Sequence, residues 1–110
     1  MADLSRDHVI SYIEAELLKI KKLLENPEFD TDKLEERTTQ MAYWVRRVRM
    51  ANTSLLQNYS DIHKLVNAAA KVAYVDLEDD DDALETLETD IKAVEDALVL
   101  CKKLQAKRRG

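Results

Sequence analysis

The sequence predicts an all-α protein that folds as an antiparallel helical bundle, and three observations carry this prediction. Its 110 residues include one Gly and one Pro, so few positions suit the tight turns that sheets require. The most frequent residues are mostly straight-chain helix formers, and β-branched and aromatic residues are less common. Apolar residues recur at spacings of three and four along every long segment. The length suits one modest core, so we expect a single domain over residues 1–110.

The first helix is predicted from about Leu4 to Asn26. One side of it carries an apolar stripe formed by Ile10, Ile13, Leu17, Ile20 and Leu24. Asp3 or Ser5 can cap its start, because a short side-chain oxygen accepts from the free N–H groups of the first turn. Pro27 ends it, since proline disfavours helical angles in the preceding residue.

The middle segment, Leu34 to Ala73, keeps the alternation of four and three without a slip and contains neither Gly nor Pro. Two architectures remain open. An unbroken helix of about 40 residues spans about 60 Å, so that three helices leave apolar surface for a second copy to cover. Alternatively, Asn58 ends one helix and Ser60 caps the next, and a turn at Asn58–Asp61 gives four helices in a compact monomer.

Self-association is predicted from the same segment. Asn52 occupies a position on the apolar stripe, where a polar residue can fix helix register and oligomeric state. The stretch that follows is apolar on most sides and includes Ile62, Val66, Ala69 and Ala73. We therefore expect a homodimer that forms through Asn52 and these four residues.

The last helix is predicted from about Ala83 to Lys107. Its stripe consists of Leu84, Leu87, Ile91, Val94, Leu98 and Cys101. Acids precede it at Asp79–Asp82 and bases end it at Lys102–Arg109, as the helix dipole favours.

Charge and cysteine content bound the location and the partners. The net charge of −5 is segregated: Asp76–Asp96 is strongly acidic, whereas Arg37–Ser60 and Ala97–Gly110 contain bases and no acid. A single cysteine, no secretory leader and no apolar run of about 20 residues predict a cytoplasmic protein that does not enter membranes.

No catalytic or metal-binding pattern stands out, so we expect neither a metal ion nor a cofactor. His8 and His63 are isolated from other ligand types. The acidic run Asp79–Asp82 lacks the alternate spacing and the glycine of a calcium loop.

An all-α magnesium-dependent nucleotide hydrolase is the third candidate function. Such enzymes bind magnesium through E-E-x-x-E on one helix and E-x-x-D on the next. Glu35 and Glu36 begin this pattern, but Thr39 stands at the third acid, and Glu78 and Asp81 are the only partners for the second motif. The pattern is therefore incomplete.

One cluster is typical of a protein-binding surface. It combines aromatic, guanidinium and thioether side chains at Tyr43, Trp44, Arg46, Arg47 and Met50. We expect a non-enzymatic protein-binding module, such as an adaptor, a regulator or a chaperone-like subunit. A purely structural role is the alternative, in which the aromatics pack on another helix and the arginines pair with Glu14, Glu16 or other acids.

A nucleic-acid-associated protein is the second candidate function. Antiparallel folding brings the basic C-terminal residues towards Arg46–Arg49. The negative net charge and the lack of a recognised nucleic-acid motif oppose it.

Overall fold

The computed structural model describes residues 5–51, 53–77 and 82–109 of the chain. Within these residues the only regular secondary structure is helical: α1 (Arg6–Leu24), α2 (Thr31–Ala51), α3 (Thr53–Asn58), α4 (Ser60–Ala73) and α5 (Ala83–Arg109). The predicted all-α class is confirmed. Neither predicted helix count matches, because the described part of the chain forms five helices rather than three or four.

The start of α1 and the turn after it follow from short polar side chains. The Ser5 hydroxyl accepts a hydrogen bond from the backbone N–H of His8 at 3.2 Å, which caps α1. After the helix, the Asn26 side chain accepts from the N–H of Glu28 at 3.0 Å. α1 and α2 are therefore joined by a short connection.

The prediction of an unbroken middle helix is wrong. Tyr59 has extended backbone angles (φ −128°, ψ 96°), so α3 ends at Asn58 and α4 begins at Ser60. This is the position of the alternative turn, although Ser60 is the first helical residue and not the cap. Before it, α2 is described to Ala51 and α3 from Thr53. Asn52, on which the predicted register depends, lies outside the described residues.

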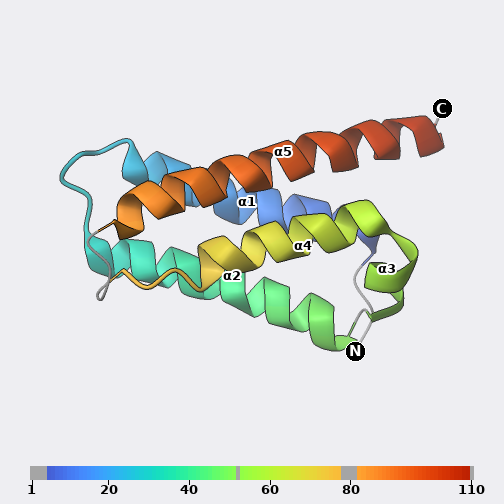
Figure 1. Ribbon diagram of the computed structural model, residues 1–110, viewed down its shortest axis with the longest axis horizontal. Coiled ribbons are helices and arrows are strands. Elements are labelled where there is room, and N and C mark those ends of the chain that lie inside the picture. Colours follow the sequence, from blue (N-terminus) through green and yellow to red (C-terminus); the bar gives the residue numbers. More distant parts are fainter. Residues whose placement is uncertain (1–4, 52, 78–81, 110) are drawn as a thin grey trace.

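The longer helices α1, α2, α4 and α5 lie alongside one another, and the short α3 connects α2 to α4 at one end (Figure 1). α4 contacts all the other helices, and α1 contacts both α2 and α5. The molecule measures 43 × 28 × 18 Å. Its length is well short of the elongated form that an unbroken middle helix requires.

The predicted stripes form most of the core, but Leu84 of the last stripe is 46% exposed. The largest fully enclosed side chains come from all four long helices and include Ile13, Leu17, Ile20, Leu34, Met41, Ile62, Leu65 and Leu87. Burial of these side chains is the main favourable contribution to folding, at about 25 cal/mol per Å² of apolar surface. None of the described helices is both long enough and apolar enough to cross a membrane.

Candidate protein-binding surface

Trp44 is held at the contact between α1 and α2 by aromatic stacking. Its ring stacks on Tyr12 of α1, with the centroids 4.2 Å apart and the planes 15° from parallel. His8 stacks on the same tyrosine at 5.9 Å, and Tyr43 meets the indole edge-on at 5.0 Å. Such pairs add about 0.5–1.5 kcal/mol each beyond area burial. Four rings from two helices therefore form one cluster.

Arg47, on the next turn of α2, contacts this cluster. Its guanidinium carbon lies 5.6 Å from the Trp44 ring centroid, which is a cation–π contact. Arg47 also donates to the Tyr43 hydroxyl at 3.4 Å. The planar guanidinium is thereby oriented at the protein surface.

Exposure distinguishes the members of the predicted cluster. Tyr43 is 44% exposed and Met50 is 82% exposed, and Arg46 is also exposed. Trp44 and Arg47 are half-buried. We use the name aromatic–basic face for Tyr12, Tyr43, Trp44, Arg46, Arg47 and Met50.

The structural alternative holds in part. Trp44 does pack on another helix, and the two acids named as candidate partners have other cations beside them. Glu14 pairs with Lys102, and Glu16 lies 3.5 Å from the ammonium of Lys19. Sequence reasoning missed Tyr12 and His8. Their spacing of four residues on one helix flank is the available signal.

The residues expected to mediate self-association lie inside the single chain. Ile62, Val66 and Ala69 are fully buried, and Ala73 is 8% exposed. The neighbouring helices α1, α2 and α5 contact α4. One chain thus covers the apolar surface that motivated a second copy, and a dimer contact at these residues requires the helices to separate. If two folded chains associate, they must do so through another surface.

The basic residues near the C-terminal ends of α2 and α5 lie at the same end of the molecule. The C-terminal ends of α2 and α5 both point to the right in Figure 1, and the end of α4 and the start of α5 lie at the opposite end. Arg49 of this region donates to the Asn67 side chain at 3.1 Å. The acidic residues 78–81, which also carry the partners of the incomplete magnesium motif, lie outside the described residues.

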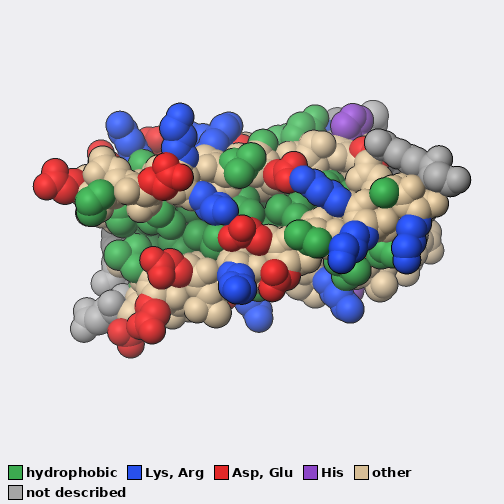
Figure 2. All heavy atoms as spheres, turned by 90° about the horizontal axis from the view of Figure 1, so that it is seen from above, with side chains coloured by type: hydrophobic (Ala, Val, Ile, Leu, Met, Phe, Trp, Pro, Cys, Tyr) green, Lys and Arg blue, Asp and Glu red, His purple; other side chains and the backbone are tan. Residues whose placement is uncertain are grey.

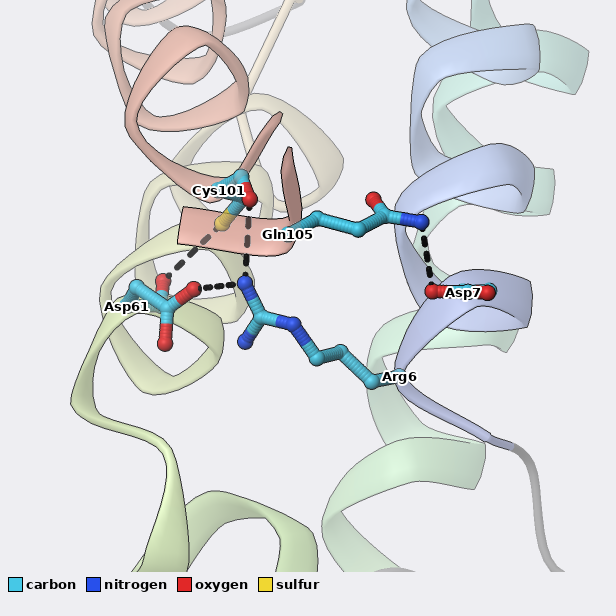
Figure 3. A network of polar contacts seen from close by, with 5 residues as sticks. All are labelled: Arg6, Asp7, Asp61, Cys101 and Gln105. Atoms are coloured by element: carbon cyan, nitrogen blue, oxygen red, sulfur yellow. Dashed lines mark hydrogen bonds and ion pairs between the residues drawn. The ribbon is translucent and has the colours of Figure 1, made fainter. Parts of the chain in front are cut away.

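A buried polar network joins α1, α4 and α5 (Figure 3). Arg6 forms an ion pair with Asp61, and its Nη2 donates to the Cys101 carbonyl at 3.0 Å. The Cys101 thiol donates to the Asp61 carbonyl at 3.4 Å. Arg6 also lies over the Tyr59 ring, with 5.3 Å from the guanidinium carbon to the centroid.

Electrostatics in this network follow from burial and pairing. The hydrogen bond and charge of Asp61 outweigh burial and raise the pKa of Arg6. Burial opposes ionisation of Asp61, but the hydrogen bond and charge of Arg6 outweigh it and lower its pKa. Burial raises the pKa of Cys101 to about 12, so the thiol is neutral and a poor nucleophile.

The remaining chemistry of the described residues is sparse. No group of three or more His, Cys, Asp or Glu side chains within 5–51, 53–77 and 82–109 is arranged to hold a metal ion. Glu35 and Thr39 line a hollow of about 410 Å³ between the start of α2 and the segment after α4. Comparison of the chain with protein-family models, with curated proteins and with solved structures yields no match.

Proposed function

We propose that this protein is a non-enzymatic helical binding module that holds a partner protein on its aromatic–basic face. The observation that carries the proposal is a half-exposed aromatic cluster, fixed by stacking across α1 and α2, beside a methionine that is 82% exposed. Aromatic, Arg and Met side chains are enriched at interfaces, and Trp, Tyr and Arg are the types that most often supply the binding energy.

The chemistry of this face specifies the partner in outline. Arg46 is exposed and Arg47 is oriented by Trp44 and Tyr43, so the face favours a segment that carries carboxylates. Met50 and the edge of Tyr43 offer apolar area to an adjacent hydrophobic side chain. A short acidic segment with an apolar anchor fits both requirements.

Charge reversal tests the proposal. The variant Arg46→Glu with Arg47→Glu is expected to keep its helicity and melting temperature, and to lose the partner in a pull-down from the native cell extract. Lys22→Glu with Lys33→Glu is the matched control, because it makes the same change in net charge at exposed positions of α1 and α2. The control is expected to retain the partner.

Two outcomes contradict the proposal. A loss of several kcal/mol in the free energy of unfolding of the arginine variant shows a structural cluster, as when a buried charge loses its partner. Capture of the same proteins by both variants places the binding surface elsewhere.

A nucleic-acid-associated function is the second candidate, because the basic ends of α2 and α5 lie at the same end of the molecule (Figure 1). It predicts that wild-type protein binds a random-sequence oligonucleotide, that the affinity falls steeply with salt, and that the arginine variant loses this binding.

A further inference from the structure

An apolar groove runs between α1 and α5 on the face seen in Figure 2, where hydrophobic side chains lie in a trough between two charged ridges. The groove encloses about 170 Å³. Leu17 and Leu98 are buried at its floor, whereas Leu18 is 58% and Val99 54% exposed at its edges. Two aliphatic side chains are thus left in water at the centre of this face.

Two ion pairs span the groove, one on each side of these aliphatic residues. The first bridge joins Glu14 of α1 to Lys102 of α5. The second bridge joins Lys21 to Glu95, with 3.0 Å between Nζ and Oε2. Leu18 follows Glu14 by four residues and precedes Lys21 by three, so it lies between the two bridges on α1. The same spacing places Val99 between the bridges on α5.

The four charges alternate in sign around the groove. Along α1 an acid is followed by a base, and along the antiparallel α5 a base lies opposite that acid and an acid opposite that base. All four side chains are 34–52% exposed. An ammonium has three donors and a carboxylate has about four acceptor sites, so each bridge keeps bonding capacity towards solvent.

We propose that a second copy of this chain docks on the groove between α1 and α5, forming a two-fold symmetric dimer. Two copies meet face to face about a two-fold axis that runs along the groove or across it. With the axis along the groove, α1 faces α5 of the other copy, and Glu14 meets Lys102. With the axis across the groove, α1 faces α1, and Glu14 meets Lys21. Opposite charges meet in both arrangements.

The occupant is a second copy because this alternating pattern is complementary to itself. Docking also removes Leu18 and Val99 from water, at about 25 cal/mol per Å² of apolar area. The groove is short, since two helical turns separate its bridges, and interfaces well below about 1,200 Å² in total area are transient. The dimer is therefore in rapid exchange with the monomer.

Sedimentation equilibrium of the full chain tests the dimer. Between about 5 and about 500 µM, the apparent mass is expected to rise from the 12.7 kDa of one chain towards twice that value. Leu18→Glu with Val99→Glu places like charges at the centre in both arrangements and is expected to raise the dissociation constant more than about tenfold. Met50→Glu with Tyr74→Glu, at positions 82% and 55% exposed, is the matched control and is expected to dimerise.

Reversal of the bridges identifies the axis. Glu14→Lys with Lys102→Glu retains an ion pair across the groove but gives each helix a single sign at both of its bridge positions. The dimer then persists if the axis runs along the groove and is lost if it runs across. In the second case, adding Lys21→Glu with Glu95→Lys restores the alternation and is expected to restore the dimer. Loss without restoration overturns the proposal.

Two further results overturn it. A wild-type chain that stays monomeric over the whole concentration range has no such contact. A dimer that is dissociated by Met50→Glu with Tyr74→Glu, and not by Leu18→Glu with Val99→Glu, forms elsewhere. The proposed dimer does not depend on the aromatic–basic face. Circular dichroism of each variant serves as the control that its helices remain folded.

Discussion

Arg6, in the first turn of α1, forms an ion pair with Asp61, in the first turn of α4, and the protein encloses both side chains. The side chain of Asp61 is 3% exposed and that of Arg6 10%. The helix dipole favours an acid at the start of α4 and disfavours a base at the start of α1. Arg6 is therefore accommodated by its partner and not by its own helix.

Removal of the Asp61 charge is expected to destabilise the fold strongly. Asp61→Asn leaves the guanidinium of Arg6 buried without a counter-charge, which costs about 3–5 kcal/mol in other buried pairs. Urea unfolding followed by circular dichroism measures this loss. Asp96→Asn, at an exposed position of α5, is the control and should change stability by less than about 0.5 kcal/mol. Equal effects of the two changes would contradict the importance of the pair.

Replacement of both partners should be far less harmful. Arg6→Met with Asp61→Leu removes both charges and their desolvation and keeps much of the apolar volume. We expect this double variant to unfold at a higher urea concentration than Asp61→Asn alone. A double variant that is less stable than Asp61→Asn would show that the pair also supplies hydrogen bonds, such as the one to the Cys101 carbonyl, that the fold requires.

The stability of the protein should depend on the ionisation of Asp61 in acid. Because the pKa of Asp61 is lowered in the folded state, its contribution is complete above the ordinary value of 3.8. That contribution is lost as the pH falls through the folded-state pKa. The stability difference between wild type and Asp61→Asn, measured in urea at a series of pH values, should be constant near neutrality and narrow below about pH 4. A constant difference down to pH 2 would contradict this linkage.

Local patterns in the sequence were sufficient to predict most of the core and the position at which one helix ends and the next begins. Ile13, Val45 and Val94 are buried as the stripes predict, because spacings of three and four define one helix face, whereas Leu84 of the last stripe is exposed. The break next to Asn58 was signalled by residues that favour helix ends and starts.

Contacts between distant segments could not be predicted from the sequence. Nothing local pairs Arg6 with Asp61 or places Tyr12 on Trp44, because both contacts depend on how the helices are rotated and staggered. For the same reason, the sequence did not show that the α4 residues expected to mediate self-association are buried within the single chain. An apolar helix face shows that it will be covered, and the sequence alone does not show whether the same chain covers it.

The Cys101 thiol should resist modification while the protein is folded. It is fully buried, and burial raises its pKa to about 12, so the reactive thiolate is scarce at neutral pH. A thiol-specific reagent such as a dithiobisbenzoate should react at pH 8 at the rate set by unfolding, and rapidly in urea. Instant labelling of the folded protein would contradict the burial.

The same shift predicts a loss of stability in alkali. The raised pKa means that the neutral thiol of Cys101 stabilises the fold, and this contribution is complete below the ordinary value of 9.0 and is lost as the pH rises towards about 12. Cys101→Ala has no such titration. The stability of wild type relative to this variant should therefore fall between about pH 9 and about pH 12, and a rise over that interval would contradict the assignment.

Trp44 reports on the contact between α1 and α2, because it is the single tryptophan of the chain. Tyr12→Ala removes the ring stacked on it at 4.2 Å and opens the indole to water. We expect the emission maximum to move to longer wavelength and the free energy of unfolding to fall by about 1–3 kcal/mol, from lost apolar burial and lost stacking. Tyr74→Ala, which truncates a tyrosine that is 55% exposed, should leave both quantities nearly unchanged.

The same Tyr12→Ala variant should also bind the partner of the aromatic–basic face more weakly. Tyr12 is only half exposed, but it positions Trp44, and Trp44 in turn orients Arg47. Unchanged emission and stability would show that the two rings do not stack in solution.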